Sequence, residues 1–199
     1  MFKLARSANP DVSHWDVSKV FHMGKMFDGA ASANPDVSKW NISNVKYMSF
    51  MFFFASSANP DVSKWDTSAV KSMGSMFEGA TSANPDVSKW DTAGVENMDS
   101  MFKEATSANP DVSNWETLKL TNITNIFYKA SSANPDVSKW NTSGVTDMYG
   151  VFRYSAIRKA DISKWNIRRD VSSSNMFCGC KNLEYLTTQI GRASCRERV

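Results

Sequence analysis

Two rows of polar side chains recur through the sequence, and their types and spacing could do chemistry. The first row is carboxylate: Asp11, Asp36, Asp61, Asp86, Asp111, Asp136 and Asp161. The second row lies three residues later and is mainly cationic: His14, Lys39, Lys64, Lys89, Asn114, Lys139 and Lys164. Regular carboxylates could hold calcium, regular ammonium groups could recognise an acidic polymer, and two opposite rows could neutralise each other as a solvated ladder.

The solvated ladder is the interpretation that we favour, with a recognition strip for a polar or acidic polymer as the alternative. The glycine-rich nonapeptide of calcium-binding β-rolls does not occur in the sequence, which argues against calcium. At one parallel-strand step of about 4.8 Å, like charges within a row repel, so each row needs the other.

Catalytic chemistry finds no support in the residue types. The two histidines, His14 and His22, occupy positions that change between repeats. The sequence has no nucleophile elbow, no phosphate-binding loop and no His and Cys at metal-ligand spacing. Cys180 aligns with small core residues, so we interpret it as a buried free thiol. We predict a protein that is not an enzyme and that has no catalytic, metal-binding or cofactor-binding residues and no cofactor.

The elements that must position these residues are set by a repeat. The heptad SANPDVS occurs six times, and the step between copies is 25 residues. The same step separates all seven tryptophans: Trp15, Trp40, Trp65, Trp90, Trp115, Trp140 and Trp165. A unit of this size cannot bury its own apolar face, so we expect each unit to be one turn of a stacked solenoid.

Each repeat shows two local signals. Asn-Pro precedes Asp-Val-Ser-Lys-Trp, which predicts a turn followed by a short extended segment. Val20, Met23, Met26, Phe27 and Ala30 then follow the spacing of one helical face. We therefore predict an α/β repeat solenoid, LRR-like and right-handed, with one short parallel strand and one short helix per 25-residue repeat.

Positions that stay constant between repeats are interpreted as core and turn, and positions that vary as solvent-facing. The seven tryptophans, together with the repeated methionines and phenylalanines, form the predicted structural core ladder. One variable region departs from this pattern, because the second repeat carries four extra aromatic residues: Tyr47, Phe50, Phe53 and Phe54.

This aromatic group is a candidate partner-binding patch, with packing against neighbouring helices as the alternative. Residues 47, 50 and 54 would share a helix face opposite the core. The other candidate partner-binding residues are the row lysines Lys39, Lys64, Lys89, Lys139 and Lys164. A weaker second aromatic set comprises Tyr128, Tyr149 and Tyr154.

The two ends of the sequence differ from the repeat. Residues 1–189 are predicted to be one tandem-repeat solenoid of about seven repeats, truncated at both ends. Residues 190–199 read IGRASCRERV and resemble a translated sequencing adapter, so we expect them to be non-native. That tail carries +2 of the +3 net charge, so the basic balance does not favour a nucleic-acid partner. No apolar run is long enough to insert into a membrane.

The repeat resembles a known family. The pattern W-D-T-S-x-V-x-x-M-x-x-M-F-x-G-A-T-S at residues 65–82 is similar to the repeats of BspA-like bacterial surface proteins, in the leucine-rich-repeat superfamily. Residues 176–186 resemble the F-x-G-C-x-x-L-x-x-L form of the same family. The L-x-x-L-x-L-x-x-N signature of leucine-rich repeats is absent, and SANPD replaces a bulkier run.

The resemblance implies a secreted or surface-anchored, extracellular protein that binds a host or matrix protein. From the sequence we therefore predict a non-enzymatic protein-binding or adhesion module whose partner is a protein or a surface polymer. The alternative is a structural spacer or scaffold that carries another domain.

Overall fold

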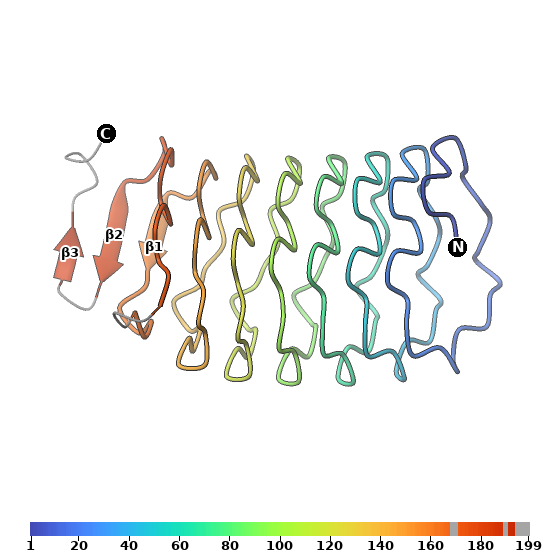
Figure 1. The fold of residues 1–199 in the computed structure, drawn as a ribbon, viewed down its shortest axis with the longest axis horizontal. Helices are drawn as coiled ribbons and strands as arrows, with labels where there is room; N and C mark the ends of the chain where they lie inside the picture. The colour runs from blue at the N-terminus through green and yellow to red at the C-terminus, as the bar shows by residue number, and fades with distance from the viewer. Residues whose placement is uncertain (168–170, 189–190, 194–199) are drawn as a thin grey trace.

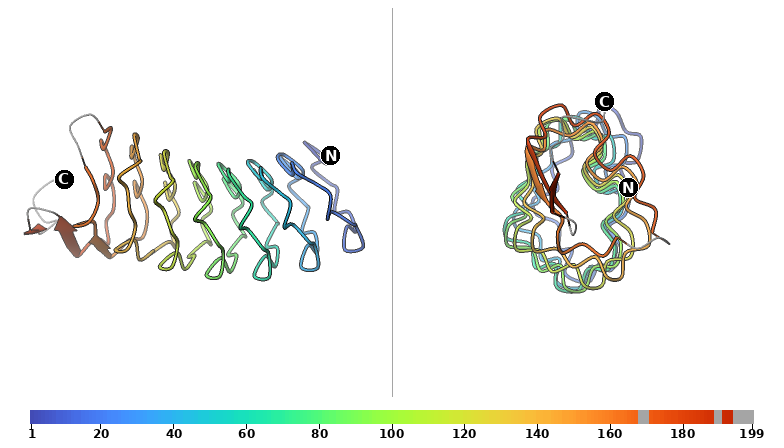
Figure 2. Two further views of the ribbon diagram at one scale, coloured as in Figure 1. Left: turned by 90° about the horizontal axis from the view of Figure 1, so that it is seen from below. Right: turned by 90° about the vertical axis from the view of Figure 1, so that its left-hand side faces the viewer.

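The structure is a single row of stacked coils. The computed structural model describes residues 1–167, 171–188 and 191–193. The chain advances one coil at a time, from the blue N-terminal coil to the red C-terminal strands (Figure 1). Seen along the row, successive coils superimpose (Figure 2, right). Equivalent residues of neighbouring coils therefore lie side by side, as a constant 25-residue step requires.

Regular strands are few among the described residues. They are β1 (Lys159–Asp161), β2 (Tyr185–Thr188) and β3 (Gly191–Ala193). These strands form one sheet in the order β1-β2-β3, with β1 and β2 parallel and β2 and β3 antiparallel. Single parallel bridges also join the coils: His22 to Tyr47, Tyr47 to Ser72, Ser72 to Asn97, Asn97 to Asn122, Asn122 to Asp147 and Asp147 to Ser172.

The predicted LRR-like α/β solenoid with one helix per repeat is wrong, because no helix occurs in the described part of the chain. Each segment that was expected to be helical contains two residues with positive φ, as at Phe50 (62°) and Phe54 (50°). A left-handed residue at every such point is incompatible with a right-handed helix, since its β-carbon would approach the following carbonyl.

Successive turns explain the apolar spacing that resembled a helix. The amide of Met51 donates to the carbonyl of Met48 (3.1 Å), and the amide of Ala55 donates to that of Phe52 (3.0 Å). Each bond closes a turn of four residues. A series of such turns returns a side chain to the core every three or four residues, which is also the spacing of a helical face.

The segment around the Asn-Pro position forms a regular strand only in the coil where the proline is replaced. Proline has no amide hydrogen to donate to a ladder. In the seventh coil Ala160 stands at that position, and β1 pairs there with β2. The amide of Ile162 then donates to the carbonyl of Thr187 (2.8 Å). The predicted strand in every repeat is therefore also wrong.

Side-chain hydrogen bonds connect the coils beside the prolines. The amide of Asn34 donates to Oδ1 of Asn9 (2.9 Å), and the same bond recurs coil after coil up to Asn134. The indole Nε1 of Trp90 donates to the carbonyl of Val62 in the preceding coil (3.1 Å). These bonds satisfy backbone groups that have no partner within their own coil.

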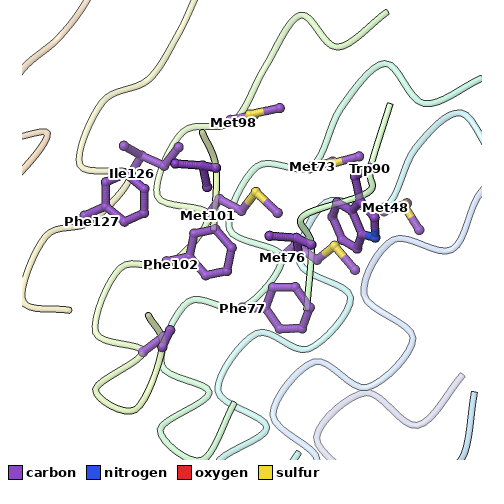
Figure 3. Packing of buried hydrophobic residues seen from close by; sticks show 14 of the residues in the cluster. Met48, Met73, Met76, Phe77, Trp90, Met98, Met101, Phe102, Ile126 and Phe127 are labelled. Atoms are coloured by element: carbon purple, nitrogen blue, oxygen red, sulfur yellow. The ribbon is translucent and has the colours of Figure 1, made fainter. Parts of the chain in front are cut away.

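Aromatic rings stack along the row in the core. Phe77, Phe102 and Phe127 come from successive coils and lie one behind another, with methionines beside them (Figure 3). The rings of Phe77 and Phe102 are nearly parallel, with centroids 5.8 Å apart, and those of Trp65 and Trp90 are 6.3 Å apart. Among the tryptophans, Trp15 is partly buried, and the following are buried: Trp40, Trp65, Trp90, Trp115, Trp140 and Trp165.

Replacing one tryptophan separates its two contributions to stability. We expect Trp90→Ala to lower the free energy of unfolding by about 3–5 kcal/mol, because it leaves a cavity within the stack. Trp90→Phe keeps a buried ring but leaves the Val62 carbonyl without its donor, and should cost about 1–3 kcal/mol. Urea unfolding of both variants measures the difference. Equal losses would contradict the assignment of a separate role to the indole hydrogen bond.

Candidate partner-binding face

The left-handed turns form one edge of the coil stack. We call this edge the turn face, and it comprises residues 1–4, 22–29, 47–54, 72–79, 97–104, 122–129, 147–154 and 172–179. In the third of these segments Met48, Met51 and Phe52 are buried, whereas Tyr47 and Phe54 are exposed. The turns therefore send apolar side chains inward and leave the residues between them at the surface.

Three of the four predicted aromatic residues form one cluster on the turn face. The ring of Phe53 packs edge-on against Phe50 (5.4 Å between centroids) and against Phe54 (4.6 Å). The ammonium group of Lys25, from the preceding coil, lies 5.1 Å from the centroid of Phe50. Phe54 remains 45% exposed. We call Phe50, Phe53 and Phe54 the phenylalanine cluster.

Tyr47 lies apart from that cluster in its contacts. Its ring stacks on His22 of the preceding coil, with centroids 4.6 Å apart, and it is 43% exposed. These aromatic residues were expected on the outer face of a helix. The helix is absent among the described residues, and the turns bring them to the surface instead.

A second group on the turn face combines tyrosines with a guanidinium. Arg153 lies over two rings, 5.7 Å from the centroid of Tyr128 and 5.1 Å from that of Tyr154. Its Nη1 donates to the hydroxyl of Tyr149 (3.1 Å). We call Tyr128, Tyr149, Arg153 and Tyr154 the tyrosine–arginine cluster. The sequence indicated only its tyrosines, as a weaker set, and missed the arginine.

Charged residues between the two clusters pair across neighbouring coils. Nζ of Lys103 lies 2.7 Å from Oε1 of Glu78, and Nζ of Lys129 lies 3.4 Å from Oε1 of Glu104. The Glu104 carboxylate raises the pKa of Lys129 through a hydrogen bond and through its charge. The partners are 25 residues apart, so each pair forms only because the coils stack in register.

Bulky side chains on the turn face pack over glycines of the next coil. A β-carbon added at Gly79 would lie 2.6 Å from Cδ1 of Phe54, and one added at Gly29 would lie 2.7 Å from Cδ2 of Leu4. Tyr154 covers Gly179 in the same way. These variable positions are therefore not independent of one another, because a bulky residue in one coil is matched by a glycine in the next.

Each aspartate of the row accepts a hydrogen bond from the serine two residues later in its own turn. Oδ1 of Asp61 accepts hydrogen bonds from the hydroxyl (2.7 Å) and the amide (3.1 Å) of Ser63. These bonds lower the pKa of Asp61 below its ordinary value of 3.8, with the hydroxyl contributing most. Equivalent bonds recur along the row. In the described part of the chain, no group of three or more His, Cys, Asp or Glu side chains could hold a metal ion.

The predicted lysines Lys39, Lys64, Lys89, Lys139 and Lys164 lie exposed in a row beside these aspartates. Nζ of Lys139 donates to Oδ1 of Asn114, one coil earlier (3.4 Å). The charges of Lys39 and Lys64 help to lower the pKa values of Asp36 and Asp61. The two rows thus act on each other electrostatically, while recognition of a polymer by the lysines remains a prediction.

A shallow depression of ≈ 300 Å³ lies at the fifth coil. Its lining includes Asn114, Glu116, Leu118 and Lys139. Most repeats have lysine at the position of Asn114, aspartate or asparagine at that of Glu116, and serine at that of Leu118. Leu118 is 64% exposed. This apolar side chain lies outside the turn face, which makes it a suitable control position.

Comparison with known proteins identifies a family. A family model described as "Mycoplasma protein of unknown function, DUF285" matches residues 1–115 and 77–190, two overlapping spans that cover most of the chain. The chain belongs to the DUF285 family. No curated protein and no solved structure matches it. The DUF285 description states no activity, so the BspA-like resemblance stays a prediction.

The second DUF285 match ends at residue 190, where the predicted non-native tail begins. Of that tail, Gly191–Ala193 forms β3, whereas residues 190 and 194–199 lie outside the described part. The non-native origin of the tail stays a prediction. Because the described residues contain no helix, they contain no helical segment that could cross a membrane.

Acid should weaken this DUF285 chain through its aspartate turns. The native pKa of Asp61 lies below 3.8, so its stabilising contribution is complete above the unfolded pKa and is lost as pH falls through the native pKa. We expect the urea midpoint to fall between about pH 5 and about pH 2. Ser63→Ala should reduce that fall, whereas Ser57→Ala, whose exposed hydroxyl lies outside the row, should not. An undiminished fall in Ser63→Ala would contradict this account.

The packing of Phe54 over Gly79 predicts coupling between these two positions. Gly79→Ala should destabilise the chain by about 1–3 kcal/mol, because φ is +68° and the added β-carbon meets the ring. Adding Phe54→Ala removes the clash, so the double variant should lose less than the sum of the two single losses. Gly179→Ala combined with Phe54→Ala should be additive, because Gly179 faces Tyr154 and lies five coils from Phe54. Urea unfolding of the two mutant cycles tests this, and equal coupling in both would rule the contact out.

Proposed function

We propose that this DUF285 chain is a non-enzymatic protein-binding module that contacts its partner along the turn face. This proposal rests on where the aromatic and cationic side chains lie. The phenylalanine cluster with Lys25 and the tyrosine–arginine cluster with Lys129 both lie on this face. Tryptophan, tyrosine and arginine side chains supply a disproportionate share of the binding energy at protein interfaces. Phenylalanine is also enriched there.

The spacing of the clusters suits a multivalent contact. Phe53 and Tyr128 occupy equivalent positions three coils apart. At one strand spacing per coil, this separation is about 14 Å. A partner segment of moderate length can therefore contact both clusters at once, and two weak contacts held by one rigid support bind more tightly than either alone.

Hydrogen bonds between coils provide that rigid support. Backbone amides of the turn face donate hydrogen bonds to carbonyls of the next coil. The amide of Phe54, for example, donates to the carbonyl of Glu78 (2.7 Å). The same regular bonding favours a second candidate function, a structural spacer or scaffold that carries another domain. The two candidates differ in one respect: only a binding module needs the aromatic side chains to remain at the surface.

The proposed setting is the cell surface or the extracellular space. This part rests on the resemblance to BspA-like repeats, which implies a host or matrix protein as the partner. A surface polymer contacting Lys39, Lys64 and Lys89 is the alternative ligand. Their exposed row supplies the positive charge that such a ligand requires.

Selection from a random peptide display library tests the binding module. We expect the chain to enrich peptides that share a consensus, and we expect Tyr47→Ser combined with Phe54→Ser to weaken their binding at least about tenfold. Leu118→Ser removes a comparably exposed apolar side chain elsewhere and should leave binding unchanged. Urea midpoints confirm that each variant is folded. Failure to enrich a consensus, or equal loss in both variants, would favour the spacer.

A further inference from the structure

Arg153 is a cation held in place without an acidic partner. The rings of Tyr128 and Tyr154 lie 5.7 Å and 5.1 Å from its guanidinium carbon. Its Nε is buried and has no hydrogen-bond acceptor among the described residues. No carboxylate in the described part of the chain forms an ion pair with it. An arginine fixed in this way retains attraction for an anion that the protein itself does not satisfy.

The hydroxyl of Tyr149 adds a second donor beside Arg153. It accepts hydrogen bonds from Nη1 of Arg153 (3.1 Å) and from Nδ2 of Asn175 (3.3 Å). A phenol oxygen has two acceptor positions and one proton. With both positions occupied, the Tyr149 proton is left to donate outward. The guanidinium and the phenol therefore offer donors to a ligand, and the Asn175 amide offers one further N–H beside its acceptor oxygen.

Neither of the two acidic residues on this part of the turn face is paired with Arg153. Glu104 is engaged by Lys129, with Oε1 and Nζ 3.4 Å apart. Oδ1 of Asp147 accepts a hydrogen bond from the amide of Tyr149 (2.8 Å). The guanidinium of Arg153 therefore forms no ion pair within the described part of the chain.

We propose that Tyr149, Arg153 and Asn175 bind a carboxylate of an acidic protein segment. This inference rests on the proposed function and names the chemistry of the partner at the tyrosine–arginine cluster. Because Nε is buried, the carboxylate would meet the two terminal nitrogens of the guanidinium, whose flat edge matches a flat carboxylate through two parallel hydrogen bonds. Tyr154 is 43% exposed and offers an aromatic surface for the residue next to the acidic one.

Nuclear magnetic resonance titration with two blocked peptides tests the proposal. A tetraglutamate peptide should shift the signals of the Arg153 Nε–H and the Asn175 side-chain amide, and a tetraglutamine peptide should not. Arg153→Gln should weaken tetraglutamate binding at least about tenfold, as the loss of a charged hydrogen-bonded pair predicts. Tyr149→Phe removes the outward donor together with the acceptor that holds Arg153 and Asn175, and it should weaken binding severalfold.

A matched variant separates a defined site from general attraction. Lys119→Gln removes one positive charge from an exposed lysine outside both the turn face and the lysine row, and it should leave tetraglutamate binding unchanged. Equal weakening by Arg153→Gln and Lys119→Gln would overturn the proposal. So would inorganic sulfate at the same ionic strength, if it shifted the same signals as strongly as tetraglutamate, because the site would then not select a carboxylate.

The two proposals can fail separately. Loss of library-peptide binding in the Tyr47 and Phe54 variant, together with unchanged tetraglutamate binding in Arg153→Gln, would keep the binding module and overturn the carboxylate site. Specific tetraglutamate binding without any enriched library peptide would instead leave the local chemistry of Arg153 standing and count against the wider binding function.

Discussion

The architecture depends on backbone hydrogen bonds that run from each coil to the next. The amides of Phe27, Phe52 and Phe77 donate to carbonyls of Met51, Met76 and Met101, each at 2.9 Å. A coil of turns has neither a helix nor a hairpin in which to satisfy these groups, and buried amides without acceptors are costly. The neighbouring coil is therefore part of the local structure of each repeat. The stacking of the phenylalanines follows from the same register, because bonded backbones hold equivalent rings face to face.

The sequence was sufficient to predict the 25-residue step and the residues that fill the core. Trp65 and Phe77 recur without insertion, and large apolar side chains at fixed intervals have few places to lie except between coils. The type of element could not be predicted in the same way. Chained turns and a helical face both return an apolar side chain every three or four residues, and φ at Phe50 or Ser75 leaves no mark on that spacing.

Candidate site residues were predictable singly but not as groups. Tyr47 and Phe54 stood out because they are aromatic at variable positions, and both lie at the surface. Arg153 could not be found by that criterion, because what distinguishes it is its contact with the ring of Tyr128, one coil earlier in the stack. Comparing each residue with the residue 25 positions away, rather than with the repeat consensus, would have revealed both this contact and the pairing of Glu78 with Lys103.

The matched positions of the turn face also limit how such a gene can change its length. Leu4 with Gly29, Phe54 with Gly79, Glu104 with Lys129 and Tyr154 with Gly179 join coils in pairs, and Glu78 with Lys103 and Tyr128 with Arg153 join one pair to the next. Recombination between repeats that removed the coil of Gly79 would bring Phe54 against Glu104 and would leave Lys103 without Glu78. Coils that share one core pattern are therefore not interchangeable at this face, and each is matched to its own neighbours.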